Sequence, residues 1–135
     1  MKEHETKIKV RYVETDRMGI VHHSNYFAWF EVGRTEFIKE QGMRYKDMEN
    51  AGVLLPLIEC GCEFKAGAKY EDELVIKTSI NSLSPVKVEF KYEVLREHDR
   101  NFLANGFTRH AFVNKEFKPI NLQKKYPEVW SIMNK

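Results

Sequence analysis

The stretch Asn25–Gln41, NYFAWFEVGRTEFIKEQ, decides the fold of this 135-residue chain. Its apolar residues recur at helical spacing and gather on one stripe of the helix that this spacing predicts. The stripe is heavily aromatic and consists of Tyr26, Trp29, Phe30, Gly33 and Phe37. Ser24 stands where an N-cap residue is expected, and Gly42 where a residue that ends a helix is expected. Because the stripe is so wide, it needs a large partner surface, such as a β-sheet.

On both sides of this helix the sequence predicts strands. Residues 6–14 alternate apolar with basic side chains, as a half-buried strand does, and residues 15–19 interrupt the alternation. A short second helix is expected around residues 45–51. Four further strands are predicted at residues 58–64, 73–82, 86–96 and 102–113. A hairpin turn at residues 98–101 joins the last two, and a short helix follows Pro119 and Asn121.

This order of elements predicts an α+β domain, in which one five-stranded antiparallel sheet wraps around one long helix and a short carboxy-terminal helix follows. The length leaves room for a single domain that spans residues 1–135. A sheet covered by one helix leaves two edge strands in need of protection. We therefore expect the edges to pair between copies of the chain in a homo-oligomer.

Composition and charge exclude several classes of protein. Apolar residues make up 42% and charged residues 31% of the chain, as in ordinary globular proteins. The net charge of +2 comes without the basic cluster that is typical of nucleic-acid binding. No stretch approaches the roughly 20 apolar residues of a membrane-spanning helix, and the amino terminus lacks an apolar signal core. We expect a cytoplasmic protein with no nucleic-acid partner and no membrane insertion.

The cysteines and histidines do not form a recognisable metal-binding pattern. Cys60 and Cys62 stand two positions apart in a predicted strand, which suits neither a mutual disulfide nor a zinc site. We expect both thiols to be reduced and buried in the core. His22 and His23 are adjacent and project differently, with no third ligand at a matching spacing, so no metal site is expected.

Asp16 is the candidate catalytic residue. It follows a predicted strand and precedes the helix start near Ser24, and Gly19 allows the intervening backbone to fold back. Its carboxylate could then face the unpaired N–H groups and the positive dipole end of the helix. A carboxylate beside such oxyanion donors suits acyl transfer. An aspartate in such a turn more often binds its own backbone, so the residues alone leave both roles open.

The segment that contains Asp16 resembles a known family. The pattern is Thr15-Asp16-x-x-Gly19-x-Val21-x-His23-x-Asn25-Tyr26, followed by Phe30-Glu31-x-x-Arg34. It is similar to the 4-hydroxybenzoyl-CoA thioesterase branch of the hotdog-fold superfamily, and above all to the bacterial acyl-CoA thioesterases associated with the Tol-Pal system. The resemblance covers residues 5–120, and the predicted order of elements matches a hotdog fold.

The resemblance implies roles for five residues. Asp16 takes the position of the catalytic carboxylate, as nucleophile or as general base for a water molecule. His23 takes the position whose backbone N–H polarises the thioester carbonyl, and its imidazole is also expected to contribute. Gly19, Tyr26 and Lys87 are expected to contact the substrate, Lys87 at its nucleotide end. Further candidates for holding the phosphates of coenzyme A are Lys65, Arg96, Arg109 and Lys118.

Two positions depart from the family pattern. His22 replaces a tyrosine that is common before the family's histidine, and residues 66–68 read Ala-Gly-Ala where many relatives have Arg-Pro-Ala. The second change removes one basic group near the nucleotide end.

The expected function is the hydrolysis of an acyl-CoA thioester to free acid and coenzyme A. We expect no cofactor, and we expect a homodimer or homotetramer. Two alternatives stay open: a hotdog hydratase or dehydratase, and a module that binds acyl-CoA or acyl carrier protein without turnover. The acyl group itself is not determined by the sequence.

Overall fold

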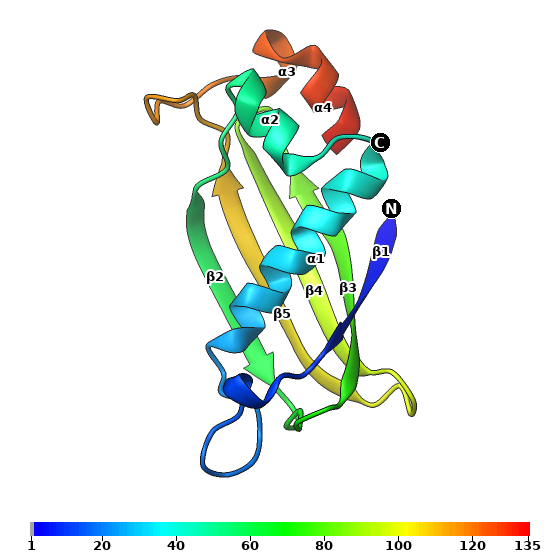
Figure 1. Ribbon diagram of the computed structural model, residues 1–135. Coiled ribbons are helices and arrows are strands. Elements are labelled where there is room, and N and C mark those ends of the chain that lie inside the picture. Colours follow the sequence, from blue (N-terminus) through cyan, green and yellow to red (C-terminus); the bar gives the residue numbers. More distant parts are fainter. Residues whose placement is uncertain (1) are drawn as a thin grey trace.

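The computed structural model describes residues 2–135, and its central feature is α1 lying across a sheet of five strands (Figure 1). The strands are β1 (Glu3–Lys9), β2 (Leu57–Phe64), β3 (Glu73–Leu83), β4 (Lys87–Arg96) and β5 (Phe102–Ala111). The helical segments are the 3-10 turn η1 (Tyr12–Glu14), α1 (Asn25–Gln41), α2 (Tyr45–Ala51), α3 (Leu122–Lys125) and α4 (Pro127–Met133). The three short α-helices gather at one end of the sheet, and the loop before α1 lies at the other end (Figure 1).

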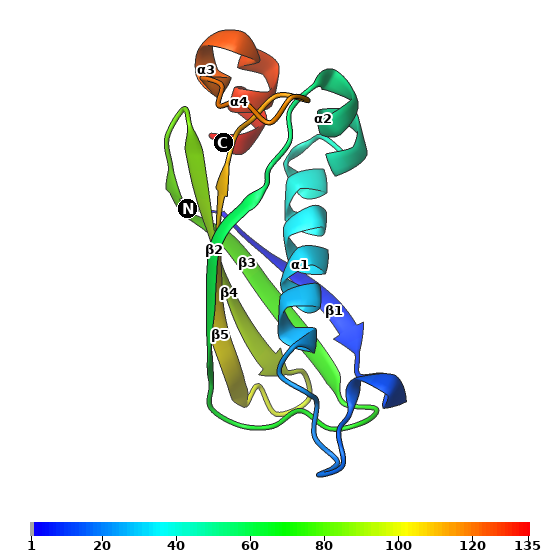
Figure 2. The ribbon, with the colours of Figure 1, turned by 90° about the vertical axis from the view of Figure 1, so that its left-hand side faces the viewer.

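The sheet is antiparallel throughout, with the strand order β1-β3-β4-β5-β2. Figure 2 shows that α1 stands on one face of this sheet. The predicted α+β hotdog arrangement, a five-stranded antiparallel sheet around one long helix, is therefore confirmed. β1 and β2 are the two edge strands.

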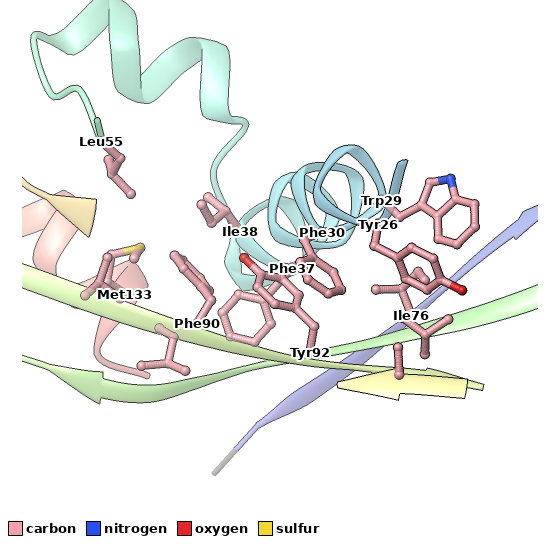
Figure 3. Packing of buried hydrophobic residues seen from close by; sticks show 14 of the residues in the cluster. Tyr26, Trp29, Phe30, Phe37, Ile38, Leu55, Ile76, Phe90, Tyr92 and Met133 are labelled. Atoms are coloured by element: carbon pink, nitrogen blue, oxygen red, sulfur yellow. The ribbon is translucent and has the colours of Figure 1, made fainter. Parts of the chain in front are cut away.

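The aromatic stripe of α1 forms the core against the middle of the sheet (Figure 3). Phe30 stacks on Tyr92 with ring centroids 4.3 Å apart, and Phe37 meets Phe90 edge-on at 6.0 Å. Each such pair contributes about 0.5–1.5 kcal/mol beyond the burial of its area. Gly33, the small residue of the stripe, lets α1 approach β3 closely. The predicted helix has the predicted bounds, and its predicted face is buried.

The chain leaves the sheet earlier than the alternation predicts. The strand predicted over residues 6–14 ends at Lys9, and the backbone turns into η1. Tyr12 is 75% exposed instead of facing the core. The turn is fixed by Glu14, whose side chain accepts a hydrogen bond from the N–H of Arg11 at 2.7 Å. The alternation of apolar and basic side chains carries no information on this bond, so the prediction of a strand beyond Lys9 is wrong.

The predicted carboxy-terminal helix is divided into α3 and α4. Pro127 lacks the N–H that a continuous helix would need, and α4 begins at this residue. Val129 and Met133 of α4 are buried.

The edge strand β2 is more exposed than predicted. Cys60 is exposed and Cys62 is partly buried, and both thiols are free. The prediction of two core cysteines is therefore wrong for Cys60, whereas Cys62 packs against the core without being fully buried. Cys60 is exposed because α1 packs mainly against β1, β3 and β4 and leaves most of β2 uncovered in a single chain. The large apolar side chains Leu57, Ile58 and Phe64 are also exposed on this strand.

Candidate active site

The loop that carries Asp16 is a small closed structure. Thr15 pairs with Val21 across it, and the N–H of Asp16 donates to the carbonyl of Ile20 at 2.8 Å. Gly19 has a φ of +80°, a left-handed conformation that side chains disfavour, so the predicted sharp turn at this glycine is confirmed. The loop is also joined to the segment after β2, because the N–H of Val21 donates to the carbonyl of Ala68 at 2.8 Å.

Asp16 uses one of its two carboxylate oxygens to hold this turn. The N–H of Met18 donates to Oδ1 at 2.8 Å, which is the bond to the local backbone that the pattern allows. Within residues 2–135, Oδ2 accepts no hydrogen bond. The half-buried carboxylate therefore has one oxygen anchored and the other available for a ligand.

The start of α1 lies next to this loop. Ser24 is the N-cap residue by position, but its side chain makes no capping bond and its Oγ lies 2.8 Å from Nδ1 of His22 instead. The N–H of Ser24 donates to the same Nδ1 at 3.2 Å, and the N–H of Tyr26 donates to the carbonyl of His23 at 3.2 Å. Across the part of the chain that the structure describes, the N–H of His23 has no acceptor. This position offers the unpaired donor that the resemblance implies.

A cavity of about 340 Å³ brings three of the predicted site residues together. Its lining includes Asp16, His23 and Tyr26, together with residues of the loop before α1 and of the segment after β2. The complete set is Asp16, Met18, Ile20, Val21, His23, Tyr26, Phe64, Lys65, Ala66 and Gly67. Gly19 lies in the turn of the same loop but is not among the residues that line the cavity, so its contact with substrate stays a prediction.

One wall of the cavity is aromatic. Phe64 meets Tyr26 edge-on with ring centroids 5.0 Å apart, and His23 at 6.2 Å. The ring of His22 lies over that of His23 at 4.2 Å. Burial raises the pKa of Tyr26 above its ordinary value, with a backbone hydrogen bond from Ala68 acting in the opposite direction, so the hydroxyl stays protonated. The wall can therefore contact a flat or apolar acyl group.

Lys87 lies elsewhere. It begins β4 and pairs with Ala111, whereas the cavity adjoins Phe64, which pairs with Ala104 and through it with Val94. The seven positions of β4 between Lys87 and Val94 correspond to about 23 Å. Within one chain, Lys87 and Asp16 are therefore not brought together, and the role of Lys87 in substrate binding stays a prediction.

Among the other basic candidates, Lys65 lines the cavity. Its Nζ lies 3.8 Å from a carboxylate oxygen of Glu63, a loose and exposed pair. Arg96 is engaged by Asp72 and Asp99, and Arg109 by Glu59 and Glu89, so both guanidinium groups already have partners. Of these three basic residues, only Lys65 lines the cavity.

Two residues of this region were missed by sequence reasoning. The sequence predicts Phe64 only as part of a strand, whereas in the structure it ends β2 and lines the cavity. The sequence predicts Glu14 at the end of the first strand, whereas in the structure it belongs to η1 and its side chain is buried. Burial raises its pKa, but hydrogen bonds from the Arg11 backbone, the Trp29 indole and the Arg11 guanidinium outweigh this effect, so the pKa is lower than usual and the carboxylate is ionised.

A second hollow lies over β2, β4 and β5 and encloses about 430 Å³. Its lining includes Gly61, Lys91 and Phe107 but none of the predicted site residues. Among residues 2–135, no group of three or more histidine, cysteine or acidic side chains is placed to hold a metal ion. No helix in the described part of the chain is long and apolar enough to cross a membrane.

Comparison with known proteins identifies the family. Residues 10–127 match the Thioesterase-like superfamily. The chain belongs to this superfamily. The prediction of a thioester hydrolase is thereby confirmed at the level of the family, while the 4-hydroxybenzoyl-CoA branch and the Tol-Pal association stay predictions.

Individual members of the superfamily are similar over nearly the whole chain. The Bacillus subtilis protein named "Putative acyl-CoA thioesterase YneP" is 39% identical over 123 residues, which cover 90% of this chain and 88% of that protein. The crystal structure of the DHNA-CoA thioesterase of Staphylococcus aureus superimposes with a TM-score of 0.94 at 32% identity, covering 99% of this chain and 90% of the other. A 4-hydroxybenzoyl-CoA thioesterase superimposes with a TM-score of 0.82 at 17% identity, over 96% of this chain and 99% of the other, a likeness of fold alone.

Proposed function

We propose that this protein hydrolyses acyl-CoA thioesters, with Asp16 as the catalytic carboxylate and the backbone N–H of His23 as an oxyanion donor. The observation that carries this proposal is the cavity that both residues line at the start of α1. The similarity to YneP, whose printed name describes an acyl-CoA thioesterase, supports the substrate class.

The proposed reaction starts with the thioester carbonyl oxygen on the N–H of His23, where the dipole of α1 favours the negative charge that develops. Asp16 then acts in one of two roles. It attacks the carbonyl carbon to form an anhydride that water hydrolyses, or it accepts a proton from the water that attacks. In either case the C–S bond breaks and coenzyme A leaves as a thiolate, which is a good leaving group and needs no strong acid beside it.

The geometry of Asp16 supports its proposed role as the catalytic carboxylate. Its Oδ1 is fixed by the N–H of Met18 at 2.8 Å, so the carboxylate is oriented before the substrate binds. Preorganised groups of this kind favour the transition state because they do not have to be ordered during the reaction. The turn bond and the catalytic role are therefore compatible in one residue.

The remaining contacts are proposed from the lining of the cavity. Tyr26 contributes part of the acyl-binding wall, and Gly19 shapes the loop through its backbone. Lys65 supplies positive charge at the edge of the cavity, where it can pair with a phosphate of coenzyme A. Lys87 is proposed to hold the nucleotide end of a substrate bound by a neighbouring subunit, since it is remote from the cavity of its own chain.

The test is a thiol-release assay with aromatic, short aliphatic and long-chain acyl-CoA substrates, beside an assay of enoyl-CoA hydration. We expect thiol release with at least one acyl class and no hydration. Hydration without thiol release would replace the proposal with a hydratase. Thermal stabilisation by acyl-CoA without release of any thiol would indicate a binding module.

A further inference from the structure

Glu14 carries a buried carboxylate that has no role in the proposed reaction. It ends η1, and only 4% of it is exposed. Burying a carboxylate is costly unless its oxygens are satisfied. Its Oε1 accepts the N–H of Arg11 at 2.7 Å, and its Oε2 accepts the indole Nε1–H of Trp29 at 3.0 Å. The guanidinium of Arg11 adds a third bond to Oε2 at 3.3 Å. The carboxylate is therefore held from both sides.

The main chain of the same residue holds the start of α1. The carbonyl oxygen of Glu14 accepts the N–H of His22 at 2.8 Å and the side-chain Nδ2 of Asn25 at 3.0 Å. Its carboxylate meanwhile reaches Trp29, which lies one helical turn further along α1. Glu14 thus contacts α1 at Asn25 and Trp29 and the loop before it at His22, so its bonds lie on both sides of His23 in the chain. It also precedes Asp16 by two residues.

We propose that Glu14 is a positioning residue, whose buried carboxylate fixes the separation between the Asp16 carboxylate and the backbone N–H of His23. This inference rests on the proposed function of those two groups. The bond from Trp29 ties η1 to α1, and the loop that carries Asp16 starts directly from η1. A displacement of about 1 Å between reacting groups can cost about 10²-fold in rate. Loss of this contact should therefore affect turnover more than substrate binding.

The first test replaces Glu14 with glutamine. Glu14→Gln keeps the size of the side chain, but its amide nitrogen cannot accept the N–H of Trp29 while its oxygen stays on the N–H of Arg11. We expect kcat for thiol release to fall about 10- to 100-fold, with KM changing less than about 3-fold. The control is Glu89→Gln, which removes another ion-paired carboxylate on the opposite face of the sheet and is expected to leave kcat unchanged. A Glu14→Gln protein with the kcat of the wild type would overturn the proposal.

A double substitution separates positioning from general damage. If Glu14 acts through the placement of Asp16, Glu14→Gln should lower the residual rate of the Asp16→Asn variant by less than about 3-fold. Losses that multiply in full would contradict the proposal, because they would mean that Glu14 acts independently of Asp16. If Asp16→Asn itself has wild-type kcat, the proposed function fails, and that result is visible before Glu14 is considered.

Trp29→Phe provides a second route if Glu14→Gln does not fold. It keeps an aromatic ring but removes the indole donor, and it leaves the Glu14 carboxylate paired with Arg11. We expect the same loss of kcat at nearly constant KM, and an unchanged kcat would overturn the proposal. The chain has two tryptophans, so the indole N–H signal of Trp29 can be assigned by its loss in Trp29→Phe. This signal is expected to shift in Glu14→Gln, and a signal that stays in place would contradict the bond.

Discussion

His110 lies at the centre of a chain of buried polar groups beneath α1. Its Nδ1 lies 3.1 Å from the carbonyl oxygen of Leu55, and its Nε2 lies 2.9 Å from Oγ1 of Thr108. The hydroxyl of Tyr92 lies 2.6 Å from the same Oγ1 and accepts a hydrogen bond from Arg34 at 3.1 Å. Arg34 therefore bonds to Tyr92 in the sheet. Burial, and to a lesser degree the charge of Arg34, lowers the pKa of His110 to about 4.

This histidine should make the fold sensitive to mild acid. In the unfolded chain its pKa is about 6.5, so between pH 6.5 and 4 the unfolded state binds a proton that the folded state excludes. Stability should fall as the pH falls through this window, by about 2 kcal/mol at pH 5 relative to pH 7. Urea denaturation at the two pH values measures the effect. His110→Gln should lack this part of the pH dependence, and an equal slope in both proteins would contradict the account.

Gly33 shows how tightly α1 is placed on the sheet. A Cβ atom at this position would lie 2.5 Å from Oγ1 of Thr78 and 3.0 Å from Cγ2 of Ile76, and both atoms belong to β3. Alanine is otherwise preferred to glycine within helices by about 1 kcal/mol. The steric conflict is the larger effect, because an overpacked core typically costs about 1–3 kcal/mol.

The expected result is that Gly33→Ala lowers the thermal midpoint of unfolding. The free energy of unfolding should fall by about 1–2 kcal/mol, with Thr35→Ala on the exposed side of the same helix as the control near zero. An increase in stability for Gly33→Ala would mean that α1 lies further from β3 than the structure places it.

Among the helices and strands, the sequence predicts those features that depend on regular side-chain spacing. The face of α1, its bounds and the glycine at its end follow from side-chain spacing, and so do the alternating strands β3, β4 and β5. The exit from β1 does not, because it depends on the bonds of the Glu14 side chain to the N–H of Arg11 and to Trp29, which is fifteen positions away. The exposure of Cys60 depends on which strands α1 covers, and spacing does not encode this choice.

The residues of the candidate site also fall into those that the sequence could predict and those that it could not. Asp16 and His23 belong to one continuous segment, so both the motif and its turn could be recognised in the sequence. The wall formed by Phe64 and Lys65 comes from the end of β2, about 40 residues later in the chain. It joins the site through tertiary contacts, the packing of Phe64 on Tyr26 and the bond of Val21 to Ala68. The remoteness of Lys87 follows from the strand register, which the sequence does not reveal.

At the level of the whole molecule, β2 is an unprotected edge. Its unpaired backbone groups and its exposed side chains Leu57, Ile58 and Phe64 are an unusual surface for a monomer. We propose that two copies pair along β2, which would cover these side chains and place a neighbouring subunit beside the cavity.

Sedimentation equilibrium tests this pairing. The wild-type chain is expected to sediment as a dimer or tetramer, and Ile58→Asp should weaken its association about 10-fold or more, because it would bury a charge without a partner. Phe117→Asp is the control, since Phe117 is 67% exposed on a loop beyond β5 and should not affect association. A wild-type chain that sediments as a monomer would contradict the proposal.

The proposed catalytic role of Asp16 can be tested by comparing two aspartate variants. Asp99 in the β4–β5 turn makes the same local bond as Asp16, with its Oδ1 accepting the N–H of Asn101 at 2.9 Å. Asparagine can preserve both turns, so Asp16→Asn and Asp99→Asn are matched at the turn bond. Asp99→Asn also removes the charge that faces Arg96, so it is the more demanding control for folding. We predict that thiol release from acyl-CoA falls about 10³-fold or more in Asp16→Asn and stays at the wild-type rate in Asp99→Asn, with both proteins folded. Wild-type release of thiol by Asp16→Asn would contradict the account.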